Sequence, residues 1–241
     1  MPYRSLMLRG VVAVLALLPF QCLWAQNISP IIAEYNDKAA GSFEVINSGL
    51  VPAVVVLEPK SFTIKEDGEG VFRDLDPSIH LELSATSLRL EARQTARIFY
   101  KVTAGKAPAW LCIYATFSSA KKQPGINLRL MLPHTIYVYQ HASLSADAIS
   151  VGRVYYDREL RRVFCEITNN SDNAGRAQAV DVTGNHASAS AGGFPLLPHL
   201  KRVVSVDWHE ENLPTKIDIE FEHFSIKRTV DPDTLRGSGR E

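Results

Sequence analysis

The sequence has few cysteines, no excess charge of either sign and, after its first 25 residues, no long apolar run. Three of the 241 residues are cysteine, and 26 basic side chains balance 26 acidic ones. No basic run is interleaved with aromatic residues, so the footprint of a nucleic-acid-binding protein is missing. No later apolar run approaches the ~18 residues of a membrane-spanning helix. We therefore expect no nucleic-acid partner and no membrane insertion of the mature chain.

Motifs that carry catalysis or hold a cofactor are also missing. The 7 histidines are scattered without the spacing of metal ligands. There is no serine nucleophile elbow and no phosphate-binding glycine loop. Asp74 and Asp76 could suggest calcium, but the rest of a binding loop is lacking, and a solvated turn is the favoured alternative. The sequence therefore predicts no enzyme, no cofactor and no metal site.

The N-terminal segment, residues 1–25, has the pattern of a cleavable secretory signal peptide. Arg4 and Arg9 precede an apolar run at 10–20 that is too short for a good membrane span, and cleavage fits best after Ala25. We therefore expect the mature chain to be exported.

The mature chain is long enough for two cores of about 100 residues each. It retains Cys112 and Cys165, which fall in different predicted domains. They form either one interdomain bridge or two small buried side chains. The second alternative is favoured, because cysteine is among the most buried residue types.

Strand-forming segments separated by turn signals fill the mature chain, and helical patterns are almost absent. Residues 43–46 (FEVI) end at an Asn-Ser-Gly turn, and residues 97–102 (RIFYKV) and 110–117 (WLCIYATF) are strongly β-prone. Strands at this spacing are typical of a β-sandwich. Residues 165–170 (CEITNN) repeat the pattern of 43–48 (FEVINS) near the start of the second half. This match favours two related sandwiches in tandem.

These boundaries follow from the turn signals and the repeat. We predict a signal peptide at 1–25, an N-terminal immunoglobulin-like domain at 26–140, a C-terminal one at 141–230 and a disordered tail at 231–241.

The most unusual stretch is 126–139 (INLRLMLPHTIYVY), whose alternation predicts one very long strand. Every second position belongs to one row, namely Ile126, Leu128, Leu130, Leu132, His134, Ile136 and Val138. At ~3.3 Å per residue the strand would run roughly 45 Å. Pro133 has no N–H and confines this part of the strand to a sheet edge or a bulge. The row is covered either by its own domain, as in an ordinary core strand, or by a strand of another chain.

Taken together, these features resemble the PapD-like periplasmic pilus-assembly chaperones. The resemblance rests on the signal peptide, the two sandwich halves and the order of the segments, and it covers nearly the whole mature chain. The matching segments are VIN at 45–47, SLRL at 87–90, RIFYK at 97–101, the Trp110 strand before the long strand, and FPLLP at 194–198.

The resemblance implies a boomerang of two immunoglobulin-like domains in the periplasm, without enzymatic activity. Such a chaperone binds an incomplete pilus or fimbrial subunit, fills its missing strand by donor strand complementation, and delivers it to an outer-membrane usher. Carried over by position, the donor row would be Ile126, Leu128, Leu130 and Leu132. Lys121 and Lys122 would lie beside the entering client.

One feature of the family is absent. Its members typically carry an arginine in the first strand and a lysine near the end of the long strand, which grip the client's terminal carboxylate. Residues 26–41 contain no arginine, and His134 stands near the second position. Arg129 and His134 are candidates to replace the pair, although Arg129 fits a solvated sheet face and His134 a polar interruption of the row. The alternative function is a non-enzymatic periplasmic binding or structural module on the same scaffold.

Overall fold

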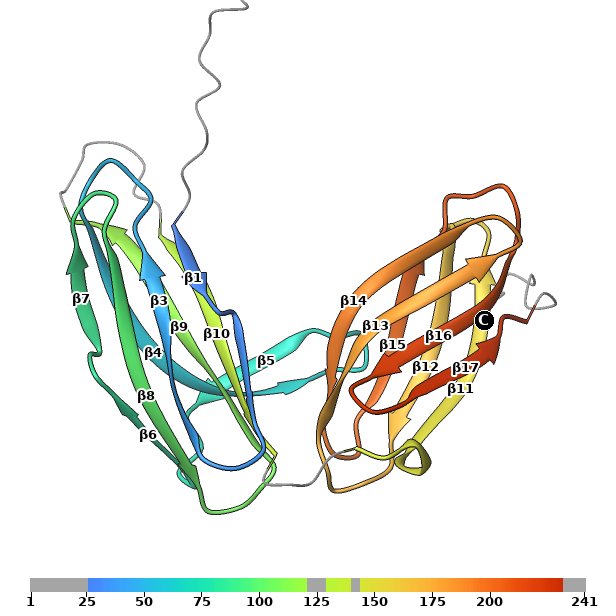
Figure 1. Ribbon diagram of the computed structural model, residues 1–241, viewed down its shortest axis with the longest axis horizontal. Coiled ribbons are helices and arrows are strands. Elements are labelled where there is room, and N and C mark those ends of the chain that lie inside the picture. Colours follow the sequence, from blue (N-terminus) through green and yellow to red (C-terminus); the bar gives the residue numbers. More distant parts are fainter. Residues whose placement is uncertain (1–25, 121–128, 140–143, 232–241) are drawn as a thin grey trace, which may run out of the picture.

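The computed structural model describes residues 26–120, 129–139 and 144–231, and these form two β-sandwiches set at an angle (Figure 1). The regular elements are strands, apart from one 3-10 helix, η1 (Ala146–Ala148). Within these ranges no helix is long and apolar enough to cross a membrane. The predicted all-β class, with two tandem immunoglobulin-like sandwiches in a boomerang arrangement, is confirmed. The predicted signal peptide, the domain boundary at 140–141 and tail positions 232–241 lie outside the described residues.

The N-terminal sandwich consists of two sheets that enclose one apolar core. The first sheet contains, in spatial order, β1 (Asn27–Ser29), β3 (Ala39–Ile46), β8 (Thr95–Ala104) and β6 (Ile79–Leu83). The second contains β2 (Ile32–Tyr35), β10 (Leu130–Val138), β9 (Ala109–Ser119), β4 (Ala53–Ile64) and β5 (Gly70–Asp74), and β7 (Ser87–Leu90) also pairs with β4. In β8 the buried Ile98, Tyr100 and Val102 alternate with exposed residues, as a strand with one face in the core requires.

The C-terminal sandwich has the same two-layer plan with its own core. One sheet contains β11 (Ile149–Asp157), β12 (Arg162–Asn169) and β15 (Lys201–Asp207); the other contains β14 (Ser188–Leu196), β13 (Gly175–Gly184), β16 (Pro214–Phe221) and β17 (Ser225–Thr229). Trp208 lies fully buried in this core, and its indole N–H donates to the carbonyl of Asn212 at 2.7 Å. Asp231, the first residue of the predicted disordered tail, instead forms a β-bridge with Tyr155.

A buried asparagine organises the same turn in each sandwich. Asn47 and Asn169 occupy equivalent places in the repeated sequence pattern, and both are fully buried. Each side-chain amide group donates to three backbone carbonyls, one of them a longer contact of 3.4 Å, and each side-chain oxygen accepts a backbone N–H two residues later. With bond lengths of 2.7–3.1 Å, the partners are Val51, Glu91 and Gly49 for Asn47, and Asn173, Leu197 and Ser171 for Asn169. The predicted repeat is confirmed in these matching networks.

The sandwiches meet at a small apolar joint of their own. Phe62, Cys112, Tyr137 and Tyr139 from the N-terminal side pack with Ala174 and Leu197 from the C-terminal side. This cluster is separate from the two domain cores.

The two mature-chain cysteines are unbridged, as the favoured prediction has it. Cys112 and Cys165 are both free and buried. Burial raises the pKa of the Cys112 thiol to about 11 and that of the Cys165 thiol to about 12. Both are therefore protonated at neutral pH and behave as small apolar side chains.

Candidate functional site

Strand β10 has an open edge along its first half. It pairs with β9 over its whole length, from Leu130 opposite Phe117 to Val138 opposite Ala109. On its other side β2 pairs only with residues 135–138. In the part of the chain that the structure describes, residues 130–133 of β10 thus have no strand partner on that side.

Pro133 faces this open edge. The backbone N–H groups of Thr135 and Tyr139 donate to the carbonyls of Ile31 and Tyr35, both at 2.8 Å. Because successive residues of a strand direct their backbone groups to opposite sides, the odd-numbered residues of β10 point to the β2 side. Pro133 therefore lacks its N–H on the open side and leaves the β9 ladder complete. The predicted placement of Pro133 at a sheet edge is confirmed.

The side chains along the open edge change from exposed to buried toward Pro133. Leu130 is 37% exposed and Met131 is 54% exposed. Leu132 is partly buried and packs against the N-terminal core. Of the predicted donor row, Ile126 and Leu128 lie outside the described residues, as do Lys121 and Lys122. The described end of the row therefore presents one exposed leucine, Leu130, next to the exposed Met131.

His134 continues the row into the core. Its ring is fully buried, stacks on Phe43 at 4.5 Å between centroids, and donates from Nδ1 to the Pro30 carbonyl at 2.7 Å. Its Nε2 has no hydrogen-bond partner, and burial lowers the pKa of His134 below its usual 6.5. A neutral, enclosed ring of this kind favours packing over the binding of a carboxylate. Arg129, by contrast, is exposed immediately before β10.

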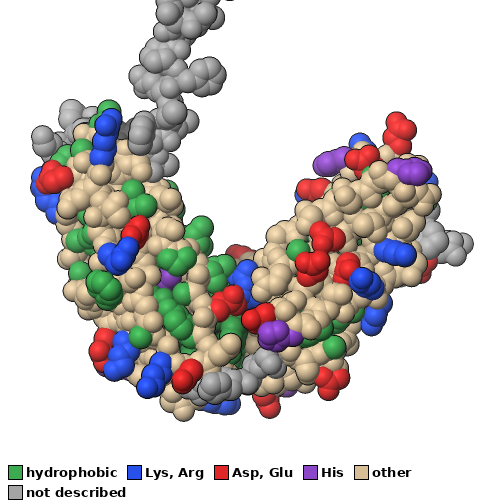
Figure 2. Space-filling model, viewed as in Figure 1, with side chains coloured by type: hydrophobic (Ala, Val, Ile, Leu, Met, Phe, Trp, Pro, Cys, Tyr) green, Lys and Arg blue, Asp and Glu red, His purple; other side chains and the backbone are tan. Residues whose placement is uncertain are grey.

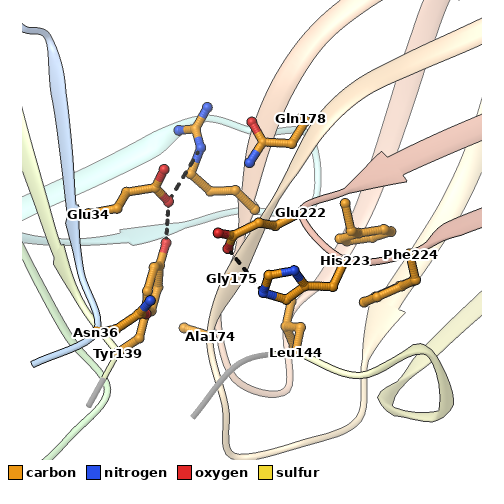
Figure 3. A pocket seen from close by; sticks show the side chains of 12 residues that line it. Glu34, Asn36, Tyr139, Leu144, Ala174, Gly175, Gln178, Glu222, His223 and Phe224 are labelled. Atoms are coloured by element: carbon orange, nitrogen blue, oxygen red, sulfur yellow. Dashed lines mark hydrogen bonds and ion pairs between the residues drawn. The ribbon is translucent and has the colours of Figure 1, made fainter. Parts of the chain in front are cut away.

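The joint between the sandwiches holds a cation that sequence reasoning missed. Arg176 of β13 is only 13% exposed, and its Nε lies 3.7 Å from an oxygen of Glu34 of β2. The same Glu34 oxygen accepts the hydroxyl of Tyr139 at 2.6 Å (Figure 3). Burial, together with the bond to this carboxylate, raises the pKa of Tyr139. Arg176 and Glu34 are far apart in sequence, so no local pattern could have predicted their pairing.

Next to this pair lies a small cavity of about 40 Å³. In Figure 3 Glu222 and His223 of the C-terminal sandwich lie on its opposite side. The two domains enclose a wider hollow, and apolar side chains show on the N-terminal sandwich more than on the C-terminal one (Figure 2).

The described residues contain no group of three or more His, Cys, Asp or Glu side chains placed to hold a metal ion. The aspartates that could have suggested calcium have other partners. Asp74 pairs with Lys60 at 3.1 Å. Asp76 accepts the backbone N–H of Ser78 at 3.0 Å, and these local hydrogen bonds lower the pKa of Asp76. For this segment a solvated turn is therefore favoured over a calcium site.

Comparison with known proteins identifies the fold. No family model matches the sequence, and no curated protein matches it. Among solved structures, the YadV chaperone superposes with a TM-score of 0.52 at 12% identity, over 85% of this chain and 99% of that one. A structure of the Salmonella enterica SafA pilin in complex with the SafB chaperone gives 0.54 at 14% identity, over 86% and 97%. The chain therefore has the two-domain fold of the fimbrial chaperones, and the resemblance predicted from the sequence is confirmed at the level of the fold.

Proposed function

We propose that this chain is a non-enzymatic periplasmic chaperone of the PapD-like family, which binds incomplete pilus or fimbrial subunits along the open edge of β10 and delivers them to an outer-membrane usher. The observation that carries the proposal is the absence of a strand partner on one side of residues 130–133, within the described part of the chain. Residues 1–25 would direct export, and a donor row of Ile126, Leu128, Leu130 and Leu132 would enter the client.

Main-chain hydrogen bonds supply the first part of the interaction. The N–H and C=O of Met131 point to the open side, and so does the carbonyl of Pro133. A client strand laid beside them would extend the sheet β10–β9–β4 on the edge where β2 pairs with the later residues of β10, which is the geometry of β-strand addition.

Apolar burial supplies the second part. Leu130 and Met131 are exposed in the free chain and would be covered by the client. Fully burying such a side chain contributes about 1.5–3 kcal/mol before the costs of ordering are subtracted.

One observation supports the alternative of a binding or structural module without a pilus client. The partly buried cation at the joint, Arg176, already faces Glu34, so it does not offer an unpaired charge to a client's terminal carboxylate. Arg129 is the exposed cation beside the edge and remains our candidate for that contact.

The test is co-purification from the periplasm of the native host with a tag after Glu241 and mass spectrometry of the bound proteins. We expect a stoichiometric small β-rich subunit that is lost in Leu130→Glu. The matched control is Leu160→Glu, which places the same charge on a leucine 60% exposed in the C-terminal sandwich.

The Leu160→Glu variant should retain the subunit. Recovery of the wild-type chain alone, while the pilus genes are expressed, would refute the proposal and support the module. If both variants retain the subunit equally, the open edge is not part of the binding surface.

A further inference from the structure

The hairpin formed by β4 and β5 leaves the N-terminal sandwich and reaches the C-terminal one (Figure 1). β4 is 12 residues long, but its pairing with β9 ends at Lys60. Residues 61–64 pair with β5 alone. The far end of the hairpin is thus held by its own ladder, by Trp110 of β9, whose indole N–H donates to the Phe62 carbonyl at 2.7 Å, and by contacts beyond its domain.

The hairpin adds a backbone contact to the second domain. The N–H of Val203 in β15 donates to the carbonyl of Glu66 at 2.8 Å. β15 lies at the edge of its three-stranded sheet, so this N–H is available on the side away from β12. Lys201 adds charge contacts, at 3.9 Å to the Glu66 carboxylate and 3.5 Å to that of Glu166.

Arg202 holds the tip of the hairpin. A Cβ added at Gly68 would lie 2.6 Å from Nη2 of Arg202, and Gly68 has a φ of +95°, which favours glycine. On its other side the guanidinium carbon lies 5.2 Å from the centroid of the Phe194 ring. The Arg202 head group is therefore held between the glycine at the hairpin tip and an aromatic ring of the second domain.

Beneath the hairpin, beside the apolar joint, the two domains leave space between them. A cavity of about 340 Å³ is lined there by residues of both sandwiches, including Phe62, Phe72, Tyr137 and Phe194. Domains joined by a limited interface are expected to move relative to each other. On this side, contacts of the hairpin rather than a filled interface restrict the angle.

We infer that the β4–β5 hairpin is a strap that fixes the angle between the two sandwiches, with Arg202 and Gly68 as its positioning residues. The Glu34–Arg176 pair is a second attachment at the joint. The inference concerns the free protein and does not depend on the proposed client.

The experiment measures the distance between the domains by double electron–electron resonance. Nitroxide labels go on Ala92→Cys, in the turn between β7 and β8, and Glu210→Cys, in the loop after β15; both positions are exposed. The native thiols are buried. We expect Arg202→Gln and Gly68→Ala to give distance distributions about twice as wide as that of the parent.

The control is Arg153→Gln, because Arg153 also lies over an aromatic ring, 4.7 Å from the centroid of Tyr155, and away from the hairpin. It should leave the distribution unchanged. The melting temperature distinguishes a freed angle from a damaged domain. If Arg202→Gln lowers the melting temperature strongly, the distance distribution of Gly68→Ala is used instead, because Gly68 lies in the hairpin and outside both domain cores. Unchanged distributions in folded variants would overturn the inference, whether or not the chain binds a pilus subunit.

Discussion

Replacing Asn169 by alanine should strongly destabilise the C-terminal sandwich. The side chain is fully buried, and its amide donates to Asn173 O at 2.7 Å and Leu197 O at 3.0 Å, while its oxygen accepts the N–H of Ser171 at 3.0 Å. Each net hydrogen bond contributes about 1 kcal/mol, and a buried group left without a partner costs about 1–3 kcal/mol. The expected loss in free energy of unfolding is therefore on the order of 3 kcal/mol.

The assay is urea unfolding followed by tryptophan fluorescence, because Trp208 reports on the C-terminal core and Trp110 of β9 on the joint between the sandwiches. Asn170→Ala is the matched control, since Asn170 makes exposed hydrogen bonds to Ala148 and Ser150. The control should shift stability by less than about 1 kcal/mol. An equal loss in the two variants, or an undiminished Trp208 transition in Asn169→Ala, would refute the reasoning.

Two further predictions concern β10. Met131→Pro removes an N–H on the open side and should weaken binding of the proposed client with little loss of stability. Leu132→Pro removes one that faces β9 and should unfold the N-terminal sandwich; similar melting temperatures would contradict the register. For His134, whose folded pKa is lowered, the neutral form stabilises the fold above about pH 6.5, and that contribution is lost as the pH falls toward the folded pKa. The urea midpoint should therefore drop between pH 7.5 and 5, and His134→Gln should reduce this drop; an unchanged pH dependence would exclude His134 as its source.

The sequence predicts best those features that depend on neighbouring residues. The β-prone composition of residues 97–102 predicts a strand, and the missing N–H of Pro133 predicts a sheet edge or a bulge. The match between residues 43–48 and 165–170 predicts the two sandwiches, because each repeats the same buried asparagine.

Features that depend on distant residues could not be predicted. The role of Arg176 depends on its ion pair with Glu34, which lies in the other sandwich. Residues 65–70 have the polar composition of a simple hairpin turn, and only the fold brings them to Arg202 and Val203. His134 could be read as a ligand-binding or a packing residue, since its type alone does not reveal that Phe43 and Pro30 surround it.

Pro133 also sets a limit on how far an added strand can extend along β10. Among the residues that the structure describes, Met131 supplies the last outward N–H of the open edge that has no strand partner. Pro133 has none, and the N–H of Thr135 is taken by Ile31. A strand of a second copy, or of any other chain, therefore cannot continue its hydrogen-bond ladder along β10 beyond Pro133. Strand addition to β10 is therefore limited to the residues up to Pro133. This limit restricts repeated self-association and leaves a short edge for recognition.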